Sequence, residues 1–396
     1  MRKLAATYIF PGNRPPLKNG LLICKDDGTV VDLLERANNW KEEAGVEFYS
    51  GVIVPGFVNT HCHLELSHLL NKIESKTGIG GFLGQINQLR KADPEVIEKA
   101  MQIADRRMWA AGIAAVGDVS NSNVSIAVKQ KSKIYYHTFV ETFGFLPSRA
   151  DRAFELAAQV RDEFISSGLP ASIVPHSPYS VSRPLFRKIQ EEAETDSGIL
   201  SIHNKESKAE EQFFENGTGP IADHFQHNIG IDLSHWQPGS SSLKTTLKFL
   251  PSKNTLLLVH NTFTNKNDLE LLNAERPSEN TFPVLCPGSN LFIENTLPPV
   301  QLFREFNMNI CLGTDSLASN TGLSVLKEMI ILQQNYPEIT LQELISWASF
   351  NGANALNISA KFGSFEFGKQ PGVNLISGLD LKQFILSKNT KVKRLL

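Results

Sequence analysis

The amino-acid sequence predicts an α/β protein in which a (β/α)8 TIM barrel carries a small β-sandwich domain made from both chain termini. Eight short β-rich runs alternate with longer helical patterns, whereas both ends of the chain are broken by Gly and Pro turns. Most of the eight runs are apolar at consecutive positions, which is typical of strands buried on both faces of a parallel sheet. A chain of 396 residues is long enough for one large domain and one small domain.

Start and stop signals support this alternation. Asp93-Pro94 can begin a helix that runs to Ala111, because Asp caps helix starts and Pro suits the first turn. Thr340 and Glu343 form a capping box ahead of a second helix. Strands separated by helices in this way indicate a parallel barrel. The predicted strands begin at Gly51, Gly112, Lys133, Ala171, Gly198, Asn254, Phe282 and Asn309.

The two ends of the chain differ from its centre. Residues 1–55 contain several short strands interrupted by Gly and Pro, and residues 360–396 are again rich in turns. Each piece is too small to bury a core alone. We therefore expect the two pieces to pair into one composite β domain, which leaves residues 56–359 for the barrel.

Composition excludes several classes of function. The formal net charge of −2 gives no reason to expect a nucleic-acid partner or an anionic membrane surface. No apolar run approaches the roughly 20 residues of a membrane span, so we expect no membrane contact. The four cysteines lack C-x-x-C spacing, which favours a reducing, cytoplasmic location over a disulfide framework.

Polar residues recur where the predicted strands end. In the run VIVPGFVNTHCH, His61 and His63 are two residues apart, so they point to the same side of one strand. Catalytic residues of parallel barrels lie at the carboxyl ends of the strands. The strand-end residues of this chain are His61, His63, His176, His203, His260, Asn290 and Asp315. Such a set indicates a metal and acid–base site.

Structural explanations exist for the single members of this set. A lone His after an apolar strand, such as His176 or His260, is often a hydrogen-bonded structural residue. Asp315 lies in Gly313-Thr314-Asp315-Ser316, which is also ordinary turn chemistry. Chance does not easily place every member at the same relative position, so the set as a whole favours a functional site.

The chain resembles the amidohydrolase superfamily, within its cytosine-deaminase-like branch of triazine chlorohydrolases and adenosylhomocysteine or aminodeoxyfutalosine deaminases. The matching segments appear in the family's order and cover nearly the whole chain. They are PGFVNTHCH, PHSPYSVS, HNKES, LVHNTF, CPGSN, GTDSLASN and GSFEFGK. As an ensemble the match is highly specific.

The resemblance implies a metal site. It assigns His61, His63, His203 and Asp315 as ligands of one divalent metal ion, with water completing the shell. Zn²⁺ suits three imidazoles and a carboxylate, although Fe²⁺ is not excluded by ligand type. Binuclear relatives use a carboxylated lysine on the fourth strand. That strand offers His176 and no lysine here, which favours a single metal.

The resemblance also implies proton-transfer roles. Glu206 lies three residues after His203 and matches the family's His-x-x-Glu, which shuttles a proton to the ring nitrogen and then to the leaving ammonia. Without the resemblance, the sequence favours a surface charge for Glu206. Asp315 can accept a proton from the attacking water. His260 would hydrogen-bond the attacking hydroxide and stabilise the tetrahedral centre.

Three further residues are candidate substrate contacts. His176 matches the family's substrate-holding His on the fourth strand. Asn290 is expected to face the pocket, although a turn role is nearly as good an account. Glu65 is expected to meet a polar substrate group, and an acid at a helix start explains it equally well.

The expected activity is metal-dependent hydrolytic deamination of a small aminated heterocycle. His-x-His followed by Leu-Glu-Leu-Ser resembles aminodeoxyfutalosine deaminases, so an adenine-type nucleoside such as aminodeoxyfutalosine is the first candidate substrate. Methylthioadenosine or adenosylhomocysteine comes next, followed by triazine-like or cytosine-like rings. A non-catalytic metal-binding barrel is the alternative from another class. Because the family often forms dimers, a homodimer is expected by analogy.

Overall fold

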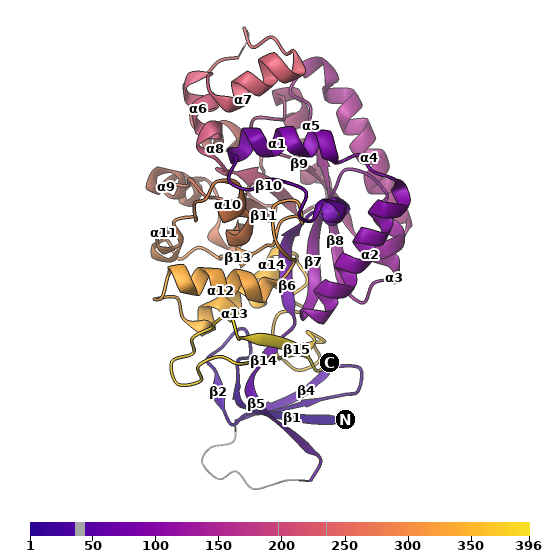
Figure 1. The fold of residues 1–396 in the computed structure, drawn as a ribbon, viewed down its shortest axis with the longest axis vertical. Helices are drawn as coiled ribbons and strands as arrows, with labels where there is room; N and C mark the ends of the chain where they lie inside the picture. The colour runs from indigo at the N-terminus through magenta and orange to yellow at the C-terminus, as the bar shows by residue number, and fades with distance from the viewer. Residues whose placement is uncertain (36–43, 197, 235) are drawn as a thin grey trace.

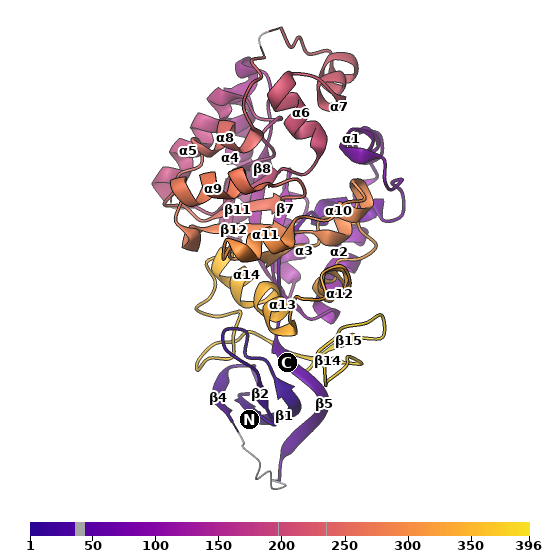
Figure 2. The ribbon, with the colours of Figure 1, turned by 90° about the vertical axis from the view of Figure 1, so that its left-hand side faces the viewer.

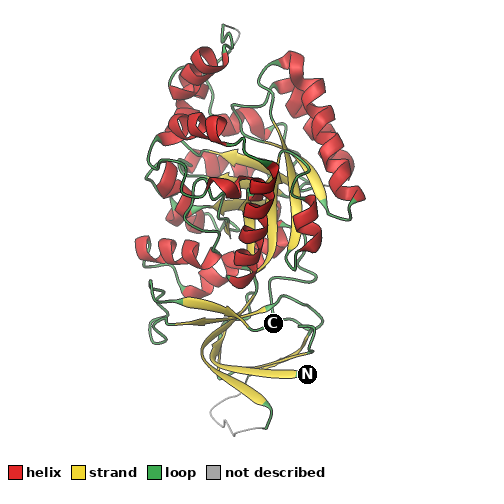
Figure 3. Cartoon of the chain, turned by 45° about the vertical axis from the view of Figure 1, so that its right-hand side comes forward, coloured by secondary structure: helices red, strands yellow, loops and turns green. Residues whose placement is uncertain are grey.

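The computed structural model describes residues 1–35, 44–196, 198–234 and 236–396. A small β-sheet lies at one end of the molecule and holds both chain termini, while a larger α/β part makes up the rest (Figures 1 and 2). In the larger part, helices surround the strands (Figure 3).

The small sheet joins the two ends of the chain. Its order is β15-β14-β5-β1-β3-β4, and β2 pairs with β1. The strands are β1 (Arg2–Ile9), β2 (Leu17–Lys18), β3 (Leu21–Cys24), β4 (Val30–Leu34), β5 (Val46–Pro55), β14 (Val373–Ser377) and β15 (Lys391–Arg394). The strands are hydrogen-bonded in one continuous order and not as two separate sheets, because the long strand β5 pairs with β1 along one edge and with β14 along the other. All seven strands therefore belong to one sheet.

The larger part contains two four-stranded parallel sheets. The first consists of β6 (Phe57–Cys62), β7 (Ile113–Ser120), β8 (Tyr135–Thr142) and β9 (Ala171–Pro175). The second consists of β10 (Leu200–Asn204), β11 (Leu256–His260), β12 (Thr281–Leu285) and β13 (Cys311–Leu312). These are close to the eight runs expected from the sequence, except that the run beginning at Gly51 is split. Residues before Gly56 belong to β5 and the small sheet, and residues after it form β6.

The two parallel sheets touch at both edges. The backbone N–H of His203 donates to the carbonyl of His176 at 2.9 Å, which links β10 to the end of β9. At the other edge, Cys62 and Asp315 form a parallel bridge, and the N–H of Thr314 donates to the carbonyl of His61 at 3.0 Å. The carboxyl ends of β6, β9, β10 and β13 therefore lie together.

Helices connect the strands, and their starts follow the sequence signals. Asp93 caps α2 by accepting the N–H of Glu95, and Thr340 and Glu343 form the expected capping box of α13. The first seven helices are α1 (Gly78–Leu89), α2 (Pro94–Ala110), α3 (Ile126–Lys131), α4 (Ala150–Ser166), α5 (Arg183–Asp196), α6 (Lys208–Asn216) and α7 (Pro220–Asp223). The others are α8 (Ser242–Leu247), α9 (Lys266–Glu275), α10 (Pro287–Ile293), α11 (Val300–Glu305), α12 (Val325–Asn335), α13 (Leu341–Ala348) and α14 (Phe350–Ala355).

Short irregular turns complete the architecture. Three 3-10 turns cover Leu64–Leu69, Pro147–Arg149 and Ser278–Asn280, and a π-helical turn covers His224–Ile229. In the described part of the chain, no helix is both long enough and apolar enough to cross a membrane.

Candidate active site

Three side chains from the two edges of the parallel sheets converge on one point. The Nε2 atoms of His61 and His63 lie 3.2 Å apart at the end of β6. The Oδ1 atom of Asp315, just beyond β13, lies 3.7 Å from the first and 3.5 Å from the second. Gly313 permits this approach, because a Cβ atom there would lie 2.8 Å from the Cβ of His61.

This spacing fits a tetrahedral metal ion. Two ligand atoms that each lie about 2.1 Å from such an ion are about 3.4 Å from each other. The three distances among His61, His63 and Asp315 are 3.2, 3.5 and 3.7 Å. The donor set of imidazole nitrogens and one carboxylate is also one that Zn²⁺ accepts. Residues and geometry therefore fit a divalent cation.

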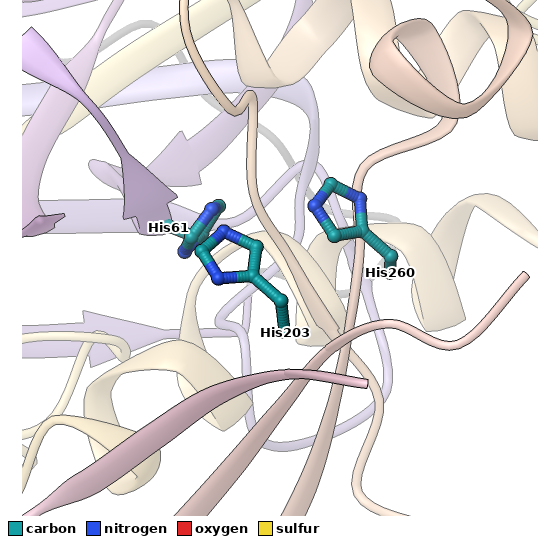
Figure 4. Close-up of side chains that lie close together, drawn as sticks. All are labelled: His61, His203 and His260. Carbon is teal, nitrogen blue, oxygen red and sulfur yellow. The ribbon is translucent and has the colours of Figure 1, made fainter. Parts of the chain in front are cut away.

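His203 brings a third imidazole from β10. Its Nδ1 atom donates to the backbone carbonyl of His176 at 2.8 Å, which leaves Nε2 as the free ring nitrogen. Ligand atoms of His61, His203 and His260 lie within 4.8 Å of one another, and Figure 4 shows the three rings gathered together. A fixed Nδ1–H is the arrangement expected of a metal-binding histidine.

The second oxygen of Asp315 is held away from the histidines. Its Oδ2 atom accepts hydrogen bonds from the hydroxyls of Ser289 and Ser319, both at 2.6 Å. Asp315 itself has a left-handed backbone with φ of 54°, a conformation that needs support from its surroundings. These contacts direct Oδ1 toward His61 and His63.

Burial favours the neutral form of His61 and His63. It lowers the pKa of His63 to about 4 and also lowers the pKa of His61 below its ordinary value. Neutral imidazole is the form that binds metals. Burial raises the pKa of Asp315, but the hydrogen bond with His61 and the neighbouring histidines more than offset this, so that the net pKa is well below the ordinary value.

Glu206 and His260 face the same point from β10 and β11. The Oε1 atom of Glu206 lies 3.5 Å from Nε2 of His260. Burial is the largest cause that raises the pKa of Glu206 well above its ordinary value, and the charge of Asp315 adds to it. Burial lowers the pKa of His260 well below its ordinary value. The pair therefore combines a carboxyl that holds its proton with a neutral imidazole.

The backbone before Glu206 is fixed by a buried lysine. Lys205 has a left-handed backbone with φ of 51°, and its fully buried ammonium lies 2.6 Å from Glu211 and 3.2 Å from Asp268. This turn directs the chain so that His203 and Glu206 both line one cavity. Glu206 is only 7 % exposed. The alternative prediction that it is a surface charge is therefore wrong.

That cavity has a volume of about 1260 Å³. Six of the expected site residues line it, namely His63, His176, His203, Glu206, His260 and Asp315. Its outer wall includes residues of α1 and residues 220–231. Such a volume exceeds the roughly 300–1,000 Å³ of most small-molecule pockets.

The three expected substrate contacts lie in different positions. His176 lines the cavity, and its Nδ1 atom is 2.8 Å from the hydroxyl of Ser180. Asn290 does not line it. Its Nδ2 atom donates to Thr262 at 2.5 Å and lies 3.5 Å from Nδ1 of His260, which places Asn290 behind the histidine.

Glu65 also lies outside the cavity lining. Its carboxylate accepts the N–H of Asn121 at 3.1 Å and the hydroxyl of Ser122 at 2.9 Å. It stands in the first turn of the 3-10 helix Leu64–Leu69. This position favours the alternative account of Glu65 as an acid at a helix start that braces a neighbouring loop.

Sequence reasoning missed Glu141. This residue lies near the carboxyl end of β8, lines the cavity and shares a cluster with His176 and His203 whose ligand atoms are within 4.8 Å of one another. The signal was available, because the run IYYHTFVET has an acid one residue before its end, close to the carboxyl edge where the other site residues lie. Arg149 and Arg152 also line the cavity. They lie in the 3-10 turn Pro147–Arg149 and in the first turn of α4, which give no such signal.

Comparison with known proteins identifies the family to which this chain belongs. The chain belongs to the amidohydrolase family, whose profile matches residues 52–395. The resemblance noted in the sequence motifs is therefore confirmed. Family membership, together with the deaminase names of the relatives described next, confirms the expectation of a hydrolytic enzyme that acts on C–N bonds.

Among curated relatives, the chain is similar to an adenosine deaminase of Helicobacter pylori, with 27% identity over 83% of this chain and 79% of the relative. It is also similar to an aminodeoxyfutalosine deaminase of a Nitratiruptor species, with 25% identity over 92% of this chain and 90% of the relative.

Solved structures share the fold. A Helicobacter pylori aminofutalosine deaminase in complex with methylthio-coformycin superimposes with a TM-score of 0.82 at 21% identity, covering 100% of both chains. A zinc complex of atrazine chlorohydrolase from Arthrobacter aurescens superimposes with a TM-score of 0.74 at 14% identity, covering 98% of this chain and 93% of the other. The likeness extends over nearly the whole chain, which therefore shares the overall α/β fold of these neighbours.

Proposed function

We propose that this protein is a metal-dependent hydrolytic deaminase that releases ammonia from an adenine-type nucleoside such as aminodeoxyfutalosine. One observation carries the proposal. His63, His203 and Asp315 line the same cavity as the pair of Glu206 and His260. His61 lies within 4.8 Å of them through two clusters of ligand atoms, one with His63 and Asp315 and the other with His203 and His260. The names of the relatives supply the substrate class.

Two finer features of the fold belong to the proposal. The two parallel sheets, linked at both edges, close into one eight-stranded (β/α)8 barrel formed by residues 56–359. Residues 1–55 and 360–396 form a composite small domain beside it. The pairing of β14 with β5 supports this division, because it ties the two ends of the chain to each other.

His61, His63, His203 and Asp315 would hold one divalent metal ion. Zn²⁺ is the first candidate, since a structural neighbour is a zinc complex, and the ligand types do not exclude Fe²⁺. When bound, such an ion supplies Lewis-acid chemistry that makes water nucleophilic near neutral pH. The fourth strand provides His176 and no lysine, which supports a single ion.

The side chains of the cavity divide the proton transfers among them. The Glu206 carboxyl donates its proton to the ring nitrogen beside the amino-bearing carbon, which makes that carbon electrophilic. Asp315 accepts a proton from the attacking water while the water oxygen bonds to the amino-bearing carbon. Nε2 of His260 hydrogen-bonds that oxygen in the tetrahedral centre. The Glu206 carboxylate then takes the hydroxyl proton of the tetrahedral centre and delivers it to the amino group, so that the C–N bond breaks, ammonia leaves and a ring carbonyl forms. The proton held by Asp315 passes back to Glu206, which restores both side chains.

The cavity favours a nucleoside with an extended substituent. Beyond the histidines its wall carries Phe143, Phe145, Arg149 and Arg152. Arginine guanidinium groups bind carboxylates through paired hydrogen bonds, and aromatic rings pack against other flat groups. The outer cavity therefore suits a substrate that adds an apolar and anionic group to the nucleoside.

Hydrolysis of a substituted triazine is a second candidate, which the structural likeness to atrazine chlorohydrolase supports. The large cavity argues for the nucleoside, because a single triazine ring would leave most of it empty. The four cysteines are unpaired and buried, which supports the proposed cytoplasmic location. We also expect a homodimer, by analogy with the family.

A substrate screen for ammonia release tests the proposal. Zinc-loaded protein is incubated with adenosine, methylthioadenosine, aminodeoxyfutalosine, cytosine and an aminotriazine. We expect turnover of the adenine nucleosides, with the highest kcat/KM for the nucleoside that carries the largest substituent. Turnover confined to cytosine or the triazine would contradict the substrate class. Lack of ammonia release from every compound would contradict deamination itself.

A further inference from the structure

Glu141 is a buried acid that the mechanism above does not use. It lies near the carboxyl end of β8, lines the cavity and is 8 % exposed. It belongs to the cluster with His176 and His203 and therefore stands beside the reacting centre.

Among the described residues, only one oxygen of the Glu141 carboxylate accepts a hydrogen bond from a side chain. The Oε2 atom accepts a hydrogen bond from Nδ2 of Asn121 at 3.0 Å. The Oε1 atom lies 3.5 Å from Nδ1 of His203, but the proton of that nitrogen is directed to the carbonyl of His176 at 2.8 Å. The Oε1 atom is therefore available as an acceptor.

The protein does not neutralise this carboxylate with a cation. Within the described ranges, no lysine or arginine forms an ion pair with Glu141, whose Oε1 atom lies 3.5 Å from Nδ1 of His203. A buried carboxylate without a cation is costly to a protein. A second metal ion is also not indicated, because His203 uses Nδ1 as a donor and cannot offer it as a ligand.

Neighbouring residues hold the carboxylate in place. Asn121, which binds Glu141, is itself fixed through its backbone N–H by the Glu65 carboxylate at 3.1 Å. On its other side, Nη2 of Arg90 lies 3.5 Å from Oδ1 of Asn121. The acceptor is therefore preorganised before a ligand arrives, as a specificity contact requires.

The chemistry of the substrate decides what this acceptor can bind. An ionised carboxylate only accepts hydrogen bonds. Adenine offers ring nitrogens that are acceptors, and its one donor is the amino group that leaves in the reaction. The remaining donors of an adenine nucleoside are the hydroxyls of its sugar.

We propose that Glu141 is a specificity-determining residue that accepts a hydrogen bond from a ribose hydroxyl of the substrate. This inference rests on the proposed function and adds to it the recognition of the sugar. A site built to bind a substrate hydroxyl discriminates strongly against the analogue that lacks it. The enzyme should therefore prefer ribosyl substrates over the corresponding deoxy compound.

A cycle of one substitution and two deoxy substrates tests this role. Wild-type and Glu141→Gln proteins are assayed with adenosine, 2′-deoxyadenosine and 3′-deoxyadenosine. Loss of a hydrogen bond to a charged group corresponds to about a 10- to 100-fold decrease in kcat/KM. We expect that decrease for adenosine, and a decrease of less than about threefold for the analogue that lacks the contacted hydroxyl.

Controls separate this role from a structural one. Metal content and thermal midpoint should match wild type in Glu141→Gln, because its amide can keep the contact with Asn121. Glu141→Asp, which retains the charge, should show the same substrate pattern with a smaller loss. An equal decrease for all three nucleosides, or no decrease for any, would overturn the assignment of Glu141 but would leave the proposed deaminase function intact. If wild-type protein turns over no adenine nucleoside, the proposed function fails, and this assignment fails with it.

Discussion

The carboxyl of Glu206 and the imidazole of His260 lie 3.5 Å apart although 54 residues separate them in the sequence. Glu206 follows β10, whereas His260 is the last residue of the neighbouring strand β11, where its backbone has a φ of 72°. This left-handed conformation is rare for a residue with a side chain. Its presence at the end of β11 indicates that the fold supports a strained turn in order to place the imidazole.

Replacement of Glu206 tests the proton transfer. Glu206→Gln should keep its metal and lose about 10²- to 10⁴-fold in kcat, because an amide cannot donate and recover a proton as a carboxyl does. The measurement is ammonia release from the best substrate, with metal content determined on the same sample. Glu215→Gln, an exposed position on α6, is the matched control. Activity within threefold of wild type in Glu206→Gln would refute the role.

Replacement of histidines should separate metal binding from substrate binding. His203→Ala should lose both metal and activity, whereas His176→Ala should retain metal and raise KM. The reason is that His203 shares a cluster with His61 and His260, while Nδ1 of His176 is directed to Ser180. Elemental analysis after dialysis provides the measurement, and His227→Ala, at an exposed position, provides the control. Equal metal content in His203→Ala and wild type would contradict the ligand assignment.

A buried ion pair stabilises the loop after the His-x-His motif. The ammonium of Lys129 lies 2.7 Å from Asp118 with both side chains fully buried, and Asp118 also accepts the N–H of Leu64 at 2.8 Å. Lys129→Met leaves an uncompensated buried charge and should lower the free energy of unfolding by about 3–5 kcal/mol. Denaturant unfolding measures this value.

The exposed pair of Lys266 and Glu270 is the control for that experiment. Lys266→Met should change the free energy of unfolding by less than about 1 kcal/mol, as is usual for surface pairs. Equal effects of the two substitutions would show that burial of the Lys129 pair does not determine its contribution.

The stability of the protein should depend on the ionisation of Glu210. Burial raises the pKa of this carboxyl to about 7 from an ordinary value of 4.5. Between these two values the folded state binds more protons than the unfolded state, so the Glu210 contribution to stability falls as pH rises through this window. Glu210→Gln mimics the protonated form. Its free energy of unfolding relative to wild type should therefore increase from pH 5 to pH 8, and a constant difference would contradict the assignment.

The strand-end positions could be predicted from the sequence because they follow from local features. An apolar run that ends in His or Asp marks both a buried strand and its carboxyl edge, and parallel topology brings such edges together. His61, His203 and Asp315 are examples. A similar rule applies to Glu141, an acid that lies one residue before the end of β8.

Other features could not be predicted because they depend on tertiary contacts. The turn at Lys205 depends on Glu211 and Asp268, which come from two later helices. The position of Asn290 behind His260 depends on the Thr262 hydroxyl. The single small sheet depends on β5, which reaches both β1 and β14. None of these partners is adjacent in the sequence.

The position of the metal ion tests the central claim most directly. Crystals of protein expressed with zinc supplementation would be measured above and below the zinc absorption edge. We predict one anomalous peak per chain, about 2.0–2.2 Å from the nearest nitrogens of His61, His63 and His203 and from Oδ1 of Asp315. A peak at another place, two peaks in the cavity, or none would contradict it.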